Sequence, residues 1–163
     1  MRIDIAGLTA TGGERAFAFV GPAADFGAIA DGVSFDGEVR VKGNVYFTGD
    51  VYRVGGEIAV TKCFDCDRCL AAVRREEVYT LAEDFSRHEH EDALLLSEAG
   101  DIELADVVRE TIIAAQPTAN YCRDDCKGLC PVCGKNLNDG DCGCERVAVD
   151  PRLAALKDFV IED

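Results

Sequence analysis

Apolar and polar positions alternate through the middle of the chain and predict a β-sheet. Over residues 38–81, Val39 and Val41 alternate with charged residues, and the same period of two returns several times. This period is typical of strands that bury one face. Gly55 and Gly56 suit a two-residue hairpin turn between two such strands. We therefore expect an antiparallel sheet, arranged as a meander or a partly open barrel.

A different period follows the sheet region and predicts one central helix over residues 101–116. Apolar residues recur there at three- and four-residue intervals, Asp101 is a good N-cap, and Pro117 ends the pattern. Residues 150–160 predict a second, short C-terminal helix that Pro151 can begin.

The expected fold class is α+β, a mainly antiparallel sheet with one central helix, a Cys-rich zinc-bound segment and a short C-terminal helix. We expect residues 1–118 to form the β-rich domain with helix 101–116. Residues 119–163 form a zinc-binding segment packed on it, or both parts form one integrated domain.

The charge balance argues against a protein that grips nucleic acid by itself. The chain has 163 residues, with 17 Lys and Arg against 31 Asp and Glu, for a net charge of −14. Proteins that bind phosphate backbones show a basic footprint instead. No apolar run approaches the length of a membrane span, and the start has no apolar leader segment. A cytoplasmic location is expected, where thiols stay reduced and clustered cysteines favour metal over disulfides.

Six of the nine cysteines lie within residues 122–144 and predict a metal site. Cys130 and Cys133 flank Pro-Val and precede Gly134, a spacing that lets two thiolates bind one metal from a tight turn. Cys142 and Cys144 follow after a polar loop. The sequence predicts that these four thiolates form one tetrahedral zinc site.

The remaining cysteines suggest a second structural zinc ion. Cys66 and Cys69 pair most simply with Cys122 and Cys126, although Cys126 and Cys130 are close enough in sequence to exchange roles. Cys63 is left over, either as a small apolar residue at a strand end or in place of one member of the upstream pair.

Nothing in the sequence points to catalysis. Both predicted sites have four protein ligands and no open position for water, which is typical of structural metal. The chain has no Gly-rich phosphate loop, no nucleophile elbow and no HExxH motif. Residues 82–100, which include His88 and His90, read as a solvated loop. We expect no enzymatic activity and no small-molecule substrate.

The cysteine motifs carry a resemblance to a known family. The run from Cys126 to Asn138, the pair Cys142-x-Cys144, the stretch Asp150-Pro-Arg-Leu153 and the element Cys66-Asp-Arg-Cys-Leu70 resemble the YceD family of large ribosomal RNA subunit accumulation proteins. The resemblance covers roughly residues 38–160. It implies a bacterial factor without catalytic activity that supports accumulation of 23S ribosomal RNA and biogenesis of the large subunit.

The acidic charge bears on the partner of such a factor. It favours a basic ribosomal protein or a pre-ribosomal particle, and leaves direct RNA binding open. Two alternatives remain for the cysteines. One is a redox-responsive zinc switch, and the other is an iron site of the rubredoxin type.

Overall fold

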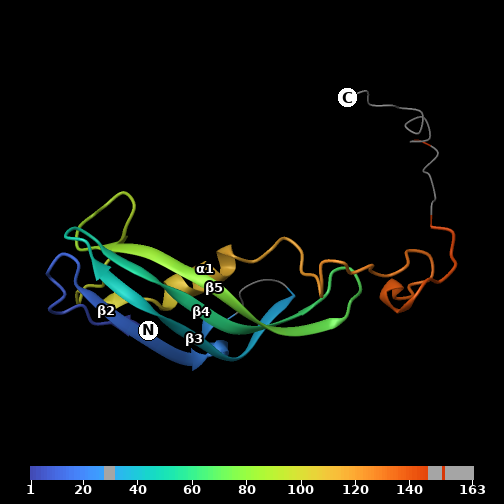
Figure 1. The fold of residues 1–163 in the computed structure, drawn as a ribbon, viewed down its shortest axis with the longest axis horizontal. Coiled ribbons are helices and arrows are strands. Elements are labelled where there is room, and N and C mark those ends of the chain that lie inside the picture. Colours follow the sequence, from blue (N-terminus) through green and yellow to red (C-terminus); the bar gives the residue numbers. More distant parts are fainter. Residues whose placement is uncertain (28–31, 147–151, 153–163) are drawn as a thin grey trace.

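A five-stranded open sheet forms the body of the molecule (Figure 1). The computed structural model describes residues 1–27, 32–146 and 152, so the predicted helix 150–160 lies outside the described residues apart from Arg152. The strand order is β2-β3-β4-β5-β6, in which β2 to β5 form an antiparallel meander and β6 joins β5 in parallel. The strands are β2 (Glu14–Pro22), β3 (Val33–Phe47), β4 (Tyr52–Asp65), β5 (Ala72–Ser86) and β6 (Leu94–Leu95). The predicted α+β class and meander are confirmed, and the sheet does not close into a barrel.

The predicted hairpin turn at Gly55 and Gly56 is wrong, because both residues lie inside β4. Gly43 of β3 is paired directly with Gly56. A Cβ atom on Gly43 would lie 2.2 Å from the Gly55 carbonyl oxygen, and one on Gly56 would lie 2.3 Å from the Lys42 carbonyl oxygen. These glycines therefore allow two backbones to approach closely within the sheet.

The helix is shorter than residues 101–116 and spans α1 (Ala105–Ala114). Strand β7 (Ile102–Glu103) occupies its predicted first turn and pairs with β1 (Arg2–Ile3), so Asp101 is not the N-cap. The backbone N–H of Leu104 donates to the Met1 carbonyl oxygen at 2.7 Å. Because β1 pairs with β7, the helix begins later in the sequence than predicted. The predicted apolar face of the helix is still buried, at Val107, Val108 and Ile112.

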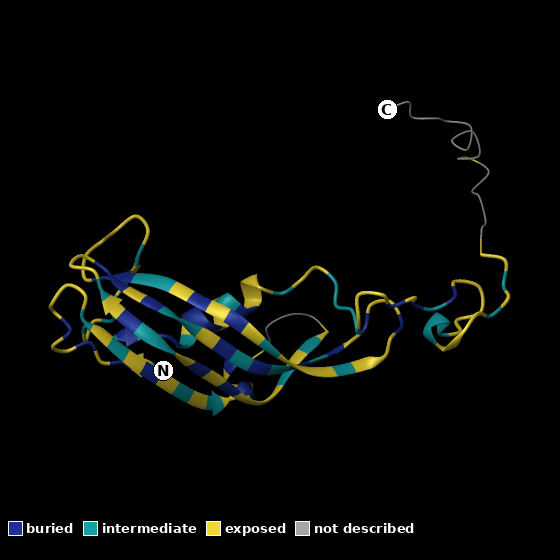
Figure 2. Cartoon of the chain, viewed as in Figure 1, coloured by how far each residue is buried: buried dark blue, intermediate teal, exposed yellow. Residues whose placement is uncertain are grey.

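Two separate clusters of buried side chains follow from this arrangement. Burial alternates along β3, β4 and β5 (Figure 2), and the inward side chains pack with α1 in the main core. A second, small cluster contains Cys66, Cys69 and Cys126 with Val73, Cys122 and Leu129 packed against it. It lies at the far end of the β4–β5 hairpin, where the cysteine-rich segment leaves the sheet (Figure 1). The thiols therefore form much of the interior at this end.

Two candidate metal centres

Eight thiols form two compact groups. The inner centre consists of Cys66, Cys69, Cys122 and Cys126, and the outer centre consists of Cys130, Cys133, Cys142 and Cys144. Within each group all the sulfur atoms lie within 4.8 Å of one another. The spacing predicted these two sets of four, and their role as metal ligands stays a prediction.

The sulfur–sulfur distances fit a tetrahedral metal site. In the inner centre, the Sγ atoms of Cys66 and Cys126 are 3.9 Å apart, and those of Cys69 and Cys122 are 3.8 Å apart. Four sulfurs at about 2.3 Å from one zinc ion are separated from one another by about 3.8 Å. A disulfide would require about 2.05 Å, and all nine cysteines are free thiols. Both groups can therefore hold a metal ion.

The Cys-x-x-Cys turns of the two centres share the same hydrogen bonds. The N–H of Leu70 donates to the Cys66 carbonyl oxygen at 2.8 Å, and the N–H of Gly134 donates to the Cys130 carbonyl oxygen at 2.9 Å. Cys66 and Cys130 each donate their own N–H to the carbonyl oxygen five residues ahead. Leu70 (φ 58°) and Gly134 (φ 73°) both adopt the left-handed conformation that closes such a turn.

Local polar contacts hold the second pair of ligands in each centre. Asn138 donates its side-chain N–H to the Cys126 sulfur at 3.4 Å and accepts from the Lys127 backbone N–H at 2.9 Å. At the outer centre, the Asp141 carboxylate accepts from the backbone N–H groups of Cys142 and Gly143. The same contacts lower the pKa of Asp141.

The protein environment stabilises one thiolate strongly in each group. Backbone N–H groups of Cys133 and Val132 lower the pKa of Cys130 to about 6. Burial opposes ionisation of Cys66, but N–H groups of Cys122, Cys69 and Arg68 prevail and lower its pKa to about 6.

Another thiol of each group resists ionisation. Burial and the neighbouring sulfurs raise the pKa of Cys122 to about 12, and contacts with Cys142 and Cys133 raise that of Cys144 to about 12. Four adjacent thiolates repel one another, so a dication that offsets part of their charge would release the remaining protons on binding.

The two centres differ in their access to solvent. Three of the four inner cysteines are buried and Cys122 is half-buried. In the outer centre only Cys130 is buried, and Cys133 is exposed. If all four thiols of a group bind one ion, no coordination position stays open, and that metal would be structural. The outer centre is the more accessible to chelators and oxidants.

Cys63 and the two histidines do not join either group. Cys63 is half-buried near the end of β4 and lines a groove of about 370 Å³ with Ser34 and Arg74. Cys63 is therefore not fully buried. It also does not replace Cys66 or Cys69 in the thiol groups formed by the described residues. His88 and His90 are exposed, and the Nε2 atom of His90 lies 3.8 Å from the Asp50 carboxylate.

The structure adds one buried polar connection that the spacing of cysteines could not reveal. Lys62 of β4 is 1% exposed, and its ammonium donates to the Asn120 side-chain oxygen at 2.6 Å. Asn120 in turn contacts Asp67 inside the first Cys-x-x-Cys turn. The sequence does carry a signal for Lys62, because the alternation of Ile58 and Val60 places it on the buried face.

An antiparallel sheet that ends in two four-cysteine groups defines a small protein with two candidate metal centres. The family model described as "Large ribosomal RNA subunit accumulation protein YceD" matches residues 54–160, a range that contains all eight cysteines. The chain belongs to this family, as its motifs had indicated.

The curated relatives are titled uncharacterized proteins. Those of Mycobacterium tuberculosis and Mycobacterium bovis are 31% identical over 143 residues, which cover 82% of this chain and 65% of theirs. One from Mycobacterium leprae is 31% identical over 117 residues, covering 68% of this chain and 54% of its own. The chain thus spans less than two thirds of the length of these relatives. No solved structure matches, and none of the described helices is long and apolar enough to cross a membrane.

Proposed function

We propose that the protein is a non-enzymatic, cytoplasmic zinc-binding factor that supports accumulation of 23S ribosomal RNA and biogenesis of the large ribosomal subunit in bacteria. The family match over residues 54–160 carries this proposal, because it covers most of β4, all of β5 and both cysteine groups. The name of the family supplies the link to large-subunit RNA.

Zinc is the metal that best suits the two centres. Four thiolates in a tetrahedral arrangement are typical of structural zinc sites, and the sulfur spacing of the inner centre agrees with that geometry. An iron site of the rubredoxin type is less well supported, because such a site is expected to be shielded by aromatic side chains. Residues 122–144 contain none, and Tyr121 just before them is the one aromatic residue next to this segment. A zinc ion in each centre would order the segment and present it at one end of the sheet.

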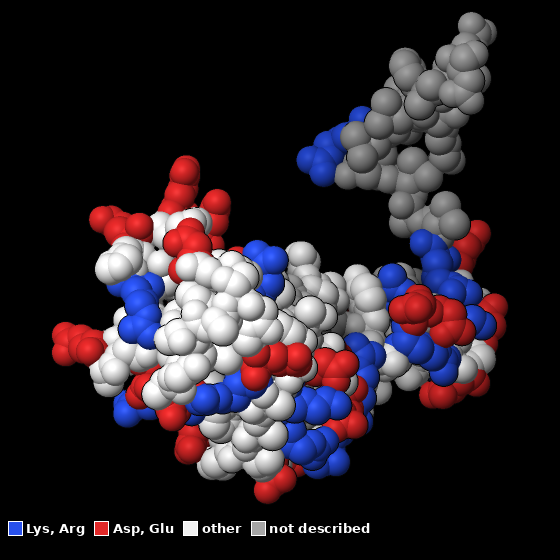
Figure 3. All heavy atoms as spheres, turned by 60° about the vertical axis from the view of Figure 1, so that its left-hand side comes forward, with Lys and Arg blue, Asp and Glu red and all other residues white. Residues whose placement is uncertain are grey.

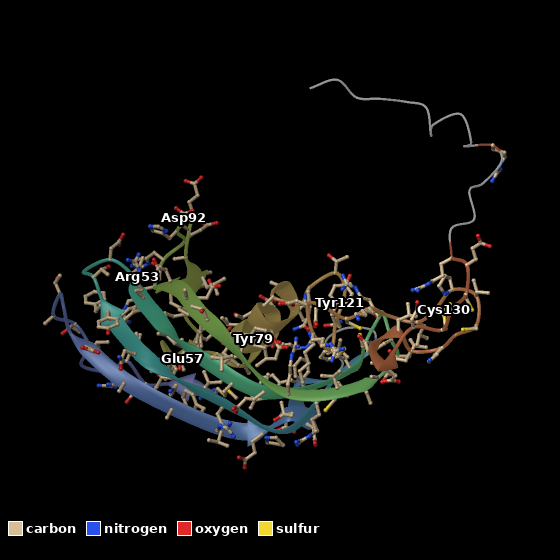
Figure 4. All side chains as sticks on the ribbon, turned by 45° about the vertical axis from the view of Figure 1, so that its right-hand side comes forward. Arg53, Glu57, Tyr79, Asp92, Tyr121 and Cys130 are labelled. Carbon is tan, nitrogen blue, oxygen red and sulfur yellow. The ribbon has the colours of Figure 1, made fainter. Side chains whose placement is uncertain are left out.

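A basic protein surface is the partner that the charges favour. Three arginines on the sheet already form ion pairs with carboxylates, so their charges are less available to bind phosphates: Arg40, Arg53 and Arg74. The loop after β5, which carries Asp92, lies at the opposite end from Tyr121 and Cys130 (Figure 4). Glu89 and Glu91 of this loop, and Glu98 in the loop after β6, form no ion pair among the described residues. Acidic side chains also project from the body in Figure 3. A basic ribosomal protein within a pre-ribosomal particle fits this surface.

Sedimentation with precursor large-subunit particles tests this function. The purified metal-loaded chain should co-sediment with these particles at moderate salt, and cells that lack the protein should show a lowered ratio of 23S to 16S ribosomal RNA. Reversal of three loop charges (Glu89→Lys, Glu91→Lys and Glu98→Lys) should weaken co-sedimentation. Reversal of Glu57→Lys, a residue paired with Lys42 on the sheet, is the matched control. Loss of the protein with no change in the ratio, or no co-sedimentation of the wild-type chain, would refute the proposal.

One observation favours a second candidate function, a redox-responsive zinc switch. Cys133 of the outer centre is exposed, so peroxide can reach it. Two thiolates and one hydrogen peroxide, with two protons, would give a disulfide and two waters and release the metal. Under mild peroxide, one metal should leave while the inner centre keeps its own. Full metal retention with unmodified thiols contradicts the switch.

A further inference from the structure

Lys62 is the one buried charged side chain among the residues that the structure describes. It is 1% exposed, its Nζ atom lies 5.2 Å from the centre of the Phe64 ring, and no carboxylate in the described part of the chain forms an ion pair with it. Burial lowers the pKa of Lys62, and the charge of Glu77 opposes that shift. A buried ammonium without a paired anion is costly, so its retention needs a reason in the fold.

The hydrogen bonds of Lys62 lead directly to the inner metal centre. Its ammonium donates to the Asn120 side-chain oxygen at 2.6 Å. The Asn120 backbone then makes two bonds with Asp67: its N–H donates to the carboxylate at 2.6 Å, and its carbonyl oxygen accepts from the Asp67 N–H at 2.9 Å. Asp67 lies between Cys66 and Cys69, and Asn120 lies two residues before Cys122. Two of these hydrogen bonds therefore fasten the arm that carries Cys122 onto the turn that carries Cys66 and Cys69, and the bond from Lys62 ties the same arm to β4.

That arm has little else to hold it. Residues 115–122 form no helix or strand, and Cys122 is the only half-buried ligand of the inner centre. The Arg68 guanidinium lies 4.0 Å from the Tyr121 ring centre, and Arg75 donates to the Tyr121 carbonyl oxygen at 3.4 Å. Both of these arginines are exposed, whereas Lys62 is buried and only its partner Asn120 is partly exposed, so water competes least with the Lys62 contact.

We propose that Lys62 is a positioning residue of the inner metal centre, which acts through Asn120 to hold Cys122 in place and whose positive charge favours four metal-bound thiolates. A dication with four thiolates carries a net charge of −2 in a largely buried site, so a fixed cation nearby lowers its electrostatic cost. Contacts behind the metal ligands typically change metal affinity by about 10- to 100-fold. The proposal concerns the inner centre alone and does not depend on the ribosomal function.

Cobalt(II) titration of the reduced, full-length chain tests this assignment, because each Co²⁺–thiolate bond contributes to an absorption band. In Lys62→Met, which keeps an unbranched side chain one atom shorter but removes the charge and the donor, one of two Co²⁺ sites should bind at least about tenfold more weakly. Its thiolate band should fall as Cys122 is lost. Lys62→Arg, which keeps a cation and its donors, should recover most of the affinity. Lys42→Met removes an exposed lysine of the same sheet and should leave both sites unchanged.

Asn120→Ala provides a second variant, because it breaks the same connection from a partly exposed loop if Lys62→Met fails to fold. It should also weaken one Co²⁺ site while the other keeps its affinity and spectrum. Wild-type affinity and spectrum at both sites in Lys62→Met or Asn120→Ala would overturn the proposal. An equal loss at both sites would also overturn it, since that result indicates a general loss of structure. A wild-type chain that binds no Co²⁺ would also overturn the proposal, because the inner centre would then not bind metal.

Discussion

Gly128 joins the two metal centres, and replacing it with alanine should weaken the inner one. It lies between Cys126 and Cys130 with φ at 72°, and a Cβ atom there would lie 3.0 Å from the Arg68 carbonyl oxygen. That oxygen accepts the backbone N–H of Leu129 at 3.0 Å, and the Gly128 carbonyl oxygen accepts from Leu137 at 2.9 Å. Gly128→Ala therefore strains the backbone and pushes the segment away from the turn that carries Cys66 and Cys69.

The magnitude follows from these two effects. A left-handed alanine costs about 1–2 kcal/mol, and loosening the Leu129–Arg68 hydrogen bond costs about 1 kcal/mol more. The sum of about 2–3 kcal/mol corresponds to a roughly 30- to 140-fold loss of affinity, at about 1.4 kcal/mol per factor of ten. Since binding of a metal to such a site is coupled to its folding, the loss should appear in the metal dissociation constant.

Competition with a zinc chelator measures this loss. Gly7→Ala is the matched control, because Gly7 has a similar φ of 81°, no neighbouring atom within 4 Å and a place far along the chain from the cysteines. Gly134→Ala also has no close neighbour and closes the outer turn, so it should weaken the outer centre by the strain alone. If Gly128→Ala binds zinc as tightly as Gly7→Ala, the close contact between the two centres plays no part in metal binding and the reasoning is refuted.

Three further predictions concern the sheet and the outer turn. Ile58→Ala, at a fully buried position, should lower the free energy of unfolding by about 2–5 kcal/mol in urea, and a loss below about 1 kcal/mol would contradict the core described. Val132→Ala, which is 63% exposed, should change stability by less than about 0.5 kcal/mol in the same assay. The Arg53 side chain lowers the pKa of Asp84, so this pair should stabilise the fold above the ordinary Asp pKa and lose its effect as the pH falls through the lowered value. Asp84→Asn should remove this part of the fall in the free energy of unfolding at acid pH, and should cost under about 1 kcal/mol at neutral pH, as expected for an exposed pair. An unchanged dependence of the free energy of unfolding on acid pH would show that the pair contributes nothing.

The local sequence pattern was sufficient to predict the antiparallel sheet and the grouping of the eight thiols. The alternation over residues 38–81 reports burial of one face directly, so the antiparallel strands could be predicted. The spacing within Cys130-x-x-Cys133 reports a single tight turn in the same way. The first turn lacks such a signal at its end, because Leu70 holds the left-handed position that Gly134 occupies in the other turn.

The errors arose where distant segments meet. Gly55 and Gly56 resemble a turn until Gly43 of the neighbouring strand is known to lie against them. Ile102 lies within the range predicted as helix, but its backbone pairs with Ile3, about a hundred residues earlier. The link from Lys62 to Asn120 also joins residues 58 positions apart. Contacts of this kind leave no local periodicity, so one sequence could not reveal them.

Metal content of the purified, reduced chain tests the central claim most directly. Mass spectrometry under native conditions should find two zinc ions in the wild-type protein and one in each of Cys66→Ser and Cys130→Ser. Cys63→Ser, which changes the one thiol outside both groups, should keep two. One metal in every variant, or a metal-free chain with disulfides, would contradict the two-centre account.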